Sequence, residues 1–353
     1  MRHYGCGRRV AQTRGGWPVL ASTLVQTSGP RLIVEPDDGL GPVLEFIGSA
    51  RASLLIKQFT FTDESLIDAV IARKAAGVDV RVMLNAARSG GDRANDETFE
   101  RFSAAGIAVQ WANPKFYVTH EKSMVVDEKT ALVATFNMCL KYFTATRDYG
   151  VVIDDPVHVA QIVEVFEADW NHDDWVPTVY EGLLWSNSNS RYHMARFIDT
   201  ATHRIDVQHP KFVDAVILDH LAAAVERGVK VHVLCGGRHG ISEGDVLDTF
   251  ASLRTLRRFG AKVHKQKNLR VHAKLMIVDD ERALVGSMNI DRSAFDLRRE
   301  LGITITEPAV VARLKATFDE DWALSHHYSP PDPLDTSTHQ EDDFPHDPEL
   351  VHE

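Results

Sequence analysis

Cysteine is scarce in this sequence of 353 residues: only Cys6, Cys139 and Cys235 occur, and no Cys-x-x-Cys pair is present. An odd, widely spaced set of this kind argues against a disulfide framework and against a structural zinc site. Long hydrophobic runs are also missing, since the apolar stretches at 131–134 and 151–153 are far shorter than the roughly 20 residues of a membrane-spanning helix. We therefore predict a cytoplasmic protein without a transmembrane segment.

A basic excess is missing as well, because the net charge is −11 at pH 7. The charge is uneven: residues 1–30 carry four arginines and no acid, whereas residues 326–353 carry eight acids and no lysine or arginine. The core is therefore near −7, which argues against a polynucleotide substrate without excluding a local basic cleft. We expect a disordered leader over 1–30, with a targeting segment as the alternative, and a disordered acidic tail over 326–353.

An internal repeat dominates the rest of the chain. Residues 120–170 align without a gap on residues 272–322, and 19 of the 51 aligned positions are identical. The matching segments are HEKSMVVDEKTALVATFN with HAKLMIVDDERALVGSMN, RDYGVVI with RELGITI, and FEADW with FDEDW. Identity this far above the chance level indicates a duplication. We therefore predict two repeats, over 31–178 and 182–325.

Each repeat shows the same alternation of strands and helices. Apolar spacing and glycine stops predict strands at 53–59, 78–84, 130–134 and 149–153 and helices at 64–76 and 96–105, and the second repeat has equivalent strands at 204–208, 229–235, 282–285 and 301–306 and helices at 213–227 and 245–259. A closing helix starts at the proline of each repeat, Pro156 and Pro308. This alternation predicts an α/β fold with mixed β-sheets flanked by helices.

A His-x-Lys-x4-Asp motif occurs once in each repeat. A single copy is weak evidence, because a surface His and Lys on an edge strand would produce the same string. Here both copies are followed, 15, 17 and 28 positions after the His, by a hydroxyl, an Asn and a carboxylate. On a strand, the His and the Lys two positions later would face one cleft, and the Asp would lie past the strand's end and support the motif from behind. The residues are His120, Lys122, Asp127, Thr135, Asn137 and Asp148, and His272, Lys274, Asp279, Ser287, Asn289 and Glu300.

These motifs resemble those of the phospholipase D superfamily, and HAKLMIVDDERALVGSMNIDRSAF resembles the second motif of bacterial cardiolipin synthases. The likeness extends over about residues 31–324. It implies two lobes related by a pseudo-twofold axis, with both His residues at one site. One His would be the nucleophile and the other the general acid and base, and we assign these roles to His120 and His272. The two Lys and two Asn of the motifs would hold the phosphoryl oxygens, with Thr135 and Ser287 in the same phosphate-binding group.

The chemistry of these residue types agrees with the resemblance. A neutral imidazole attacks an anionic phosphodiester without charge repulsion, and two Lys ammonium groups neutralise the phosphoryl oxygens, which predicts a phospho-histidine intermediate. Asp148 and Glu300 would accept a hydrogen bond from the second nitrogen of each ring. No metal or cofactor is required. The first repeat departs from the family, with Ala-Thr-Phe-Asn at 134–137 in place of the commoner Gly-Ser or Gly-Thr and Asp148 in place of Glu, so the division of roles between the halves stays open.

Other residues have both a functional and a structural interpretation. The resemblance places Gln58 and His209 near the cleft, although strand-end residues would look the same. Three aromatic residues could line an apolar acyl slot: Trp111, Phe116 and Tyr117. Core packing is the interpretation for Trp170 and Trp322. A metal site is the less favoured interpretation of the histidines His326, His327, His339, His346 and His352.

Three function classes follow. The leading one is a phospholipase D-type phosphodiesterase or phosphatidyltransferase, which meets phospholipid peripherally at a membrane and passes the phosphatidyl group to water, an alcohol or phosphatidylglycerol. A metal-independent nuclease acting on DNA or RNA needs the same centre with a basic track leading to it. A non-catalytic binding module is disfavoured because both motifs are intact. Head group, acceptor, protein partners and oligomeric state are not predicted.

Overall fold

The computed structural model describes residues 29–88, 91–178, 180, 182–238, 241 and 243–335. The predicted leader therefore lies outside the described residues except for Gly29 and Pro30, and the predicted tail lies outside them from residue 336. Within the described ranges, no helix has the length and apolarity needed to cross a bilayer.

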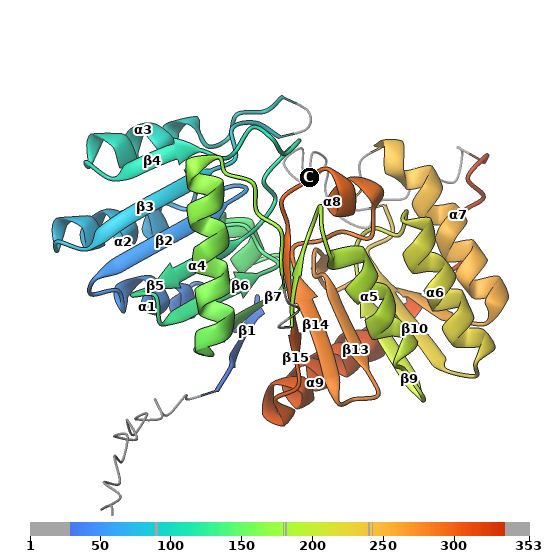
Figure 1. Ribbon diagram of the computed structural model, residues 1–353. Coiled ribbons are helices and arrows are strands. Elements are labelled where there is room, and N and C mark those ends of the chain that lie inside the picture. The colour runs from blue at the N-terminus through green and yellow to red at the C-terminus, as the bar shows by residue number, and fades with distance from the viewer. Residues whose placement is uncertain are drawn as a thin grey trace, which may run out of the picture.

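Two eight-stranded mixed sheets form the framework (Figure 1), and seven strands of each sheet follow one common order. In each sheet, three neighbouring strands run parallel and the strands on the motif side pair antiparallel. The first sheet has the order β1 (Arg31–Glu35), β7 (Thr146–Ile153), β6 (Thr130–Ala134), β5 (Ser123–Val126), β2 (Ser53–Gln58), β3 (Asp79–Leu84) and β4 (Ala108–Trp111), with β12 (Arg270–Val271) added on β7. The second has β8 (Leu183–Trp185), β15 (Leu301–Ile305), β14 (Arg282–Gly286), β13 (Leu275–Val278), β9 (Arg204–Gln208), β10 (Lys230–Cys235), β11 (Lys262–Lys265) and β16 (His326–His327).

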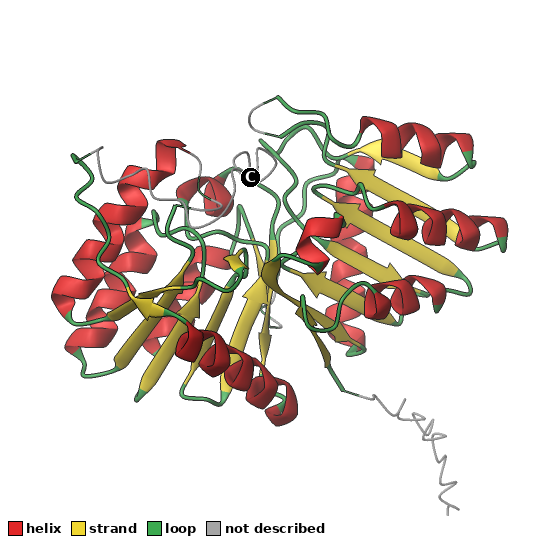
Figure 2. Ribbon diagram, turned by 180° about the vertical axis from the view of Figure 1, so that it is seen from behind, coloured by secondary structure: helices red, strands yellow, loops and turns green. Residues whose placement is uncertain are grey.

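Helices cover both faces of each sheet, as Figures 1 and 2 show. The outer face of the first sheet packs on α1 (Gly41–Gly48), α2 (Glu64–Ala75) and α3 (Asp96–Ala104), and that of the second packs on α5 (Ser190–Asp199), α6 (Ala215–Glu226) and α7 (Glu243–Phe259). A central core joins the halves and contains side chains of both sheets and of the closing helices α4 (Pro156–Asn171) and α9 (Pro308–Leu324). Two short helices, η1 (Leu140–Phe143) and α8 (Arg292–Asp296), complete the fold.

Local sequence signals account for the boundaries of the helices. The Asp63 carboxylate caps α2 by accepting the Leu66 N–H, and Asp214 caps α6 in the same way. Just beyond these helices, Gly77 and Gly228 adopt φ values of 88° and 89°, which favour glycine and end the helix. The predicted α/β class with two mixed sheets is confirmed, and most predicted elements agree with the structure to within two residues.

The predicted start of the tail is wrong. The chain continues past residue 325 as β16, which pairs antiparallel with β11, and the Tyr328 N–H then donates to the Val263 carbonyl. Backbone pairing with an open sheet edge orders this segment despite its low hydrophobicity. Seven other elements were not predicted. β1, α1, β8 and α5 precede the region where the two repeats align, and η1, β12 and α8 are only two to five residues long.

Candidate active site

The sequence predicts each motif histidine on a strand, but in the structure each one lies just before a strand, β5 or β13. β5 begins at Ser123 and β13 at Leu275, so each His and Lys occupies the extended segment leading into the strand. The Lys122 ammonium still turns back to donate to the carbonyl of His120 at 2.8 Å, and Lys274 does the same to His272 at 2.7 Å. The His and Lys of each motif are therefore close together even though no strand carries them.

Backbone hydrogen bonds explain why these segments leave their own sheet. The His120 and Glu121 N–H groups both donate to the Arg299 carbonyl of the second half, at 2.9 and 3.0 Å. In the equivalent contact, the His272 and Ala273 N–H groups both donate to the Arg147 carbonyl of the first half. Each motif is thus anchored on the opposite half, at the Arg that directly precedes the carboxylate of that half, Glu300 or Asp148.

The carboxylates complete this exchange between the halves. His120 Nδ1 lies 2.9 Å from Glu300 Oε2, and His272 Nδ1 lies 2.6 Å from Asp148 Oδ1, with all four side chains buried. A ring that donates from Nδ1 presents Nε2 for chemistry, so each carboxylate sets tautomer and orientation. Both expected carboxylate–imidazole contacts are present, and each one joins residues of different repeats.

Hydroxyl groups hold the carboxylates in turn. The Thr135 hydroxyl donates to Asp148 Oδ1 at 2.5 Å and accepts the Tyr149 N–H, while Thr146 donates to Asp148 Oδ2 at 2.5 Å. Ser287 accepts the Leu301 N–H at 3.1 Å, next to Glu300. The Thr135 proton is thus directed at a carboxylate, which is a different contact from the phosphate binding expected from the sequence.

Positive charge and buried amides surround the rings. Lys122 and Lys274 are 1% and 2% exposed, and the Lys274 ammonium lies 2.8 Å from His272 Nε2. Burial raises the pKa of the Glu300 carboxyl to about 8, although the charges of Lys122 and Arg298 lower it. Asn137 and Asn289 are also buried. Two buried ammonium groups beside the two rings favour an anionic substrate at this site.

Asp127 and Asp279, the last residues of the two motifs, contact backbone. Asp127 Oδ1 accepts the N–H groups of Arg51, Ala52 and Ser53, which lead into β2, at 2.7–3.0 Å. Asp279 accepts the equivalent N–H groups of residues 202–204 before β9. Each Asp ties the far end of the motif strand to its neighbour, in line with the expected supporting position behind the motif.

Replacing Asp279 by Ala is expected to lower the free energy of unfolding by about 1–3 kcal/mol, because three backbone N–H groups lose their acceptor. Partial burial raises the pKa of Asp279, but these N–H groups outweigh it and lower the pKa from 3.8 to about 2. The stabilisation is therefore present above about pH 4 and is lost as the pH falls towards 2. Urea unfolding of both proteins at pH 7 and pH 2.5 measures this, and an equal difference at both pH values would contradict it.

Sequence reasoning missed a second set of crossed ion pairs. Arg147 Nε lies 2.8 Å from Asp321 Oδ2 on α9, and Arg299 Nη2 lies 2.8 Å from Asp169 Oδ1 on α4. Each Arg supplies the carbonyl that anchors the opposite motif, so the closing helix of one half holds the strand start of the other. The repeat carries a signal for these pairs, because the Arg is identical in the segments RDYG and RELG and the Asp is identical in FEADW and FDEDW.

The two strand-end candidates lie near the site. Gln58 and His209 are buried, and the side-chain nitrogen and oxygen of Gln58 have no hydrogen-bond partner among the described residues. Burial lowers the pKa of His209 well below its usual range, and the charges of Lys274 and His272 lower it further. His209 therefore stays neutral, and it and Gln58 are two uncharged polar groups beside the motif residues.

The aromatic candidates occupy different environments. Trp111 stacks on Phe99, Phe116 lies beneath the Arg299 guanidinium at 4.2 Å, and Tyr117 is 60% exposed. Trp170 and Trp322 pack on the central core but are only partly buried. Of the predicted histidine cluster, His326 and His327 belong to β16, while His339, His346 and His352 lie outside the described residues. In the part of the chain that is described, no three potential ligands are arranged to hold a metal ion.

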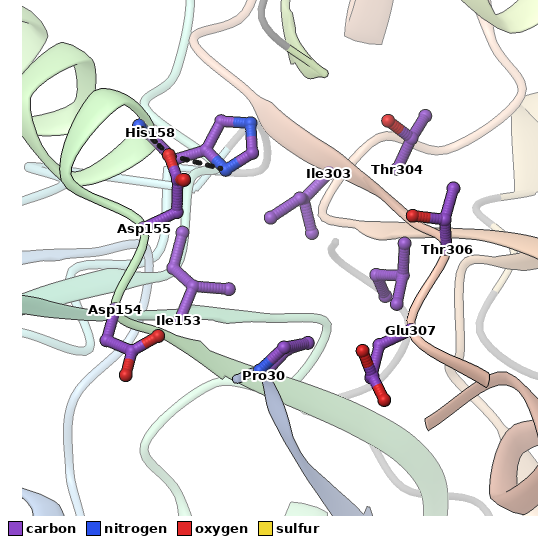
Figure 3. Close-up of a pocket in the computed structure, with 10 residues that line it drawn as sticks. Pro30, Ile153, Asp154, Asp155, His158, Ile303, Thr304, Thr306 and Glu307 are labelled. Atoms are coloured by element: carbon purple, nitrogen blue, oxygen red, sulfur yellow. Dashed lines mark hydrogen bonds and ion pairs between the residues drawn. The ribbon is translucent and has the colours of Figure 1, made fainter. Parts of the chain in front are cut away.

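A pocket of about 230 Å³ lies at the other ends of β7 and β15 (Figure 3). Its walls include Ile153, Asp154 and Ile303, and Figure 3 shows the side chains of Asp155 and His158 facing each other at its rim. Asp155 caps α4 by accepting the Val157 and His158 N–H groups. The pocket is therefore distinct from the histidine site, at the opposite end of the same strands.

Comparison with known proteins places this geometry in a family. The family model described as "Cardiolipin synthase, PLD-like domain" matches residues 43–170 and 194–322. The major cardiolipin synthase ClsA of Bacillus subtilis is 25% identical, over 84% of this chain and 70% of its own length. Cardiolipin synthase A of Pseudomonas fluorescens is 27% identical, over 89% of this chain and 72% of its own length.

Solved structures share the fold at low sequence identity. The phosphatidylserine synthase of Haemophilus influenzae has a TM-score of 0.67 and 14% identity, covering 86% of this chain and 88% of its own. The polyphosphate kinase of Porphyromonas gingivalis has the same TM-score and 16% identity, covering 88% of this chain and 51% of its own. Since the family model matches most of the chain in two segments that correspond to the two sheets, the protein belongs to the phospholipase D-like family of cardiolipin synthase domains.

Proposed function

We propose that this protein is a phosphatidyltransferase of the phospholipase D type, which moves a phosphatidyl group from a phospholipid to an alcohol or to water. The observation that carries the proposal is the crossed arrangement of two buried histidines, each oriented by a carboxylate of the other half. Membership of the cardiolipin synthase domain family and the names of the relatives support a phospholipid substrate.

In the first step, His120 Nε2 attacks phosphorus, and a phosphorus–nitrogen bond forms as the bond to the leaving alcohol breaks. His272 donates its Nε2 proton to that alcohol. The ammonium groups of Lys122 and Lys274, with the amides of Asn137 and Asn289, stabilise the phosphoryl oxygens. The hydrogen bond between Glu300 and His120 Nδ1 orients the attacking ring so that Nε2 faces the phosphorus.

In the second step, His272 accepts a proton from the incoming alcohol or water. The new oxygen attacks phosphorus, and His120 leaves as a neutral imidazole. Every proton taken up in one step is released in the other, so the two histidines balance the cycle between them.

Peripheral contact with a membrane is part of the proposal. Tyr117 and Leu297 are 60% and 53% exposed, and the Tyr117 N–H donates to the Leu297 carbonyl at 2.9 Å. They precede His120 and Glu300 by three residues each, so two exposed apolar side chains lie together next to the site. We place this contact at the cytoplasmic surface of a membrane.

The proposed function is tested by supplying alternative substrates in the presence of a chelator. Vesicles of phosphatidylglycerol and phosphatidylethanolamine are expected to yield phosphatidic acid or a new phospholipid, detected by mass spectrometry, while single-stranded DNA and RNA stay intact. The variant with both His120 and His272 replaced by Ala should yield no product, and co-sedimentation checks binding to the vesicles. Salt-sensitive cleavage of DNA or RNA, with all lipids untouched, would favour a nuclease instead.

A further inference from the structure

One buried acidic residue beside the site has no part in the mechanism above. Glu35 is the last residue of β1, and it lies directly opposite Asp148 in the antiparallel pair of β1 and β7. Side chains of directly opposite residues lie on one face of a sheet, with Cβ atoms about 4.5–5.5 Å apart. Both residues are 0% exposed. The Glu35 carboxyl group is therefore a close, buried neighbour of the carboxylate that orients His272.

This carboxyl group favours its protonated form. Neither of its oxygens has a hydrogen-bond partner of normal geometry within the described ranges, and an unpaired buried carboxylate is costly. Burial and then the charge of Asp148 raise the pKa of Glu35 to about 8, and the Gly39 N–H lowers it by less. At neutral pH, Glu35 is therefore mostly a neutral acid that can donate a hydrogen bond.

The charged groups around Glu35 are largely matched with one another. The Arg147 guanidinium binds the Glu35 backbone carbonyl at 2.8 Å together with the carboxylates of Asp37 and Asp321, so its positive charge is already compensated. The titratable and charged groups that face this region come from β7, the loop after β1, helix α9 and the second motif: Arg147, Asp148, Tyr149, Asp37, Asp38, Arg313, Asp321 and His272.

Asp148 has room for one more donor. A carboxylate offers about four acceptor positions, two on each oxygen. Thr135 and His272 occupy Oδ1, and Thr146 contacts Oδ2, which leaves a position on Oδ2. A protonated Glu35 carboxyl group, directly opposite on the neighbouring strand, would supply this donor.

We propose that Glu35 is a positioning residue for His272, acting as a protonated carboxyl group that donates to Asp148 and fixes the carboxylate that orients the ring. The inference rests on the proposed function. It also makes the half-sites unequal, because the residue opposite Glu300 is Ser186, whose hydroxyl accepts the Glu300 N–H at 2.6 Å. Among the described residues, the position directly opposite the orienting carboxylate is therefore ionisable in the half-site of His272 and not in that of His120.

The test compares Glu35→Gln and Glu35→Ala with the wild type from pH 6 to 9.5. Gln keeps a neutral donor at every pH, so Glu35→Gln should keep kcat within about threefold at pH 7 and lose less activity than the wild type above pH 8. Ala removes the donor and should lower kcat about tenfold at all pH values. Glu300 titrates in the same range but is present in all three proteins, so the comparison removes its effect. Glu45→Gln, on the exposed face of α1, is the matched control.

A second measurement needs no substrate, so its failure is distinct from failure of the proposed function. In protein labelled with ¹³C at the Glu side-chain carboxyl carbon, one resonance absent from Glu35→Gln should titrate near pH 8. A resonance that titrates near pH 4 would overturn the proposal, as would identical pH profiles for wild type and Glu35→Gln. If Glu35→Ala does not fold, the pH profile of Glu35→Gln and the ¹³C titration of Glu35 still test the proposal.

Discussion

His272→Ala, given an activated phosphodiester whose leaving group needs no proton, is expected to accumulate phosphate on His120, whereas His120→Ala forms no phospho-enzyme. The first step then proceeds without a general acid, but the second lacks its base, so the intermediate persists. With a natural phospholipid, each variant should lose at least about 10³-fold in kcat. Removal of the nucleophile abolishes the covalent route, and removal of the general acid leaves a poor alkoxide leaving group. This is the largest effect we expect from a single substitution.

Acid quench followed by peptide mapping in a mass spectrometer locates the phosphate. His220→Ala is the matched control, because His220 Nδ1 also contacts an Asp carboxylate, that of Asp199 at 2.7 Å, but on helix α6 outside the site. Its rate and its phospho-enzyme should match those of the wild type. Phosphate on His272 in the wild-type protein would reverse the two roles, and turnover without phospho-histidine in any variant would rule out the covalent mechanism.

Substitution of either crossed carboxylate, Asp148 or Glu300, is expected to cause the second-largest loss of activity. Asp148→Asn should reduce kcat by about 10²–10⁴, because an amide that turns its NH₂ group towards Nδ1 favours the wrong tautomer of His272. Glu300→Gln should act in the same way on His120. Both changes keep the size of the side chain, so the fold should be retained.

Histidine ring NMR shows which imidazole responds to each change. In ¹⁵N-labelled protein, Asp148→Asn is expected to move the ring signals of His272 first, and Glu300→Gln those of His120. Assignments come from the two His→Ala variants. The reverse pattern, in which each carboxylate affects the histidine of its own repeat, would contradict the crossed geometry.

Much of the fold was predictable because its signals are local. Asp63 and Asp214 at helix starts, Gly77 and Gly228 at helix ends, and alternating apolar strands act within a few residues of the chain. The repeat doubled each of these signals. Elements outside the well-aligned region, such as β1 and β16, have no second copy that can be recognised in the sequence, and β16 is ordered by pairing with a strand about 60 residues away.

The sequence by itself determined the chemistry of this protein: two histidines, two lysines and two carboxylates at equal spacing in two copies, with the fold that presents them. The tertiary structure decided which of them act together. Asp148 follows His120 by 28 residues yet orients His272, because the motif segments pair with the strand starts of the opposite half. The same packing brings Glu35 next to Asp148 and Asp321 next to Arg147. Equal spacing along the chain shows which residues of the two repeats are equivalent, whereas the packing of the two sheets decides which of those residues are in contact.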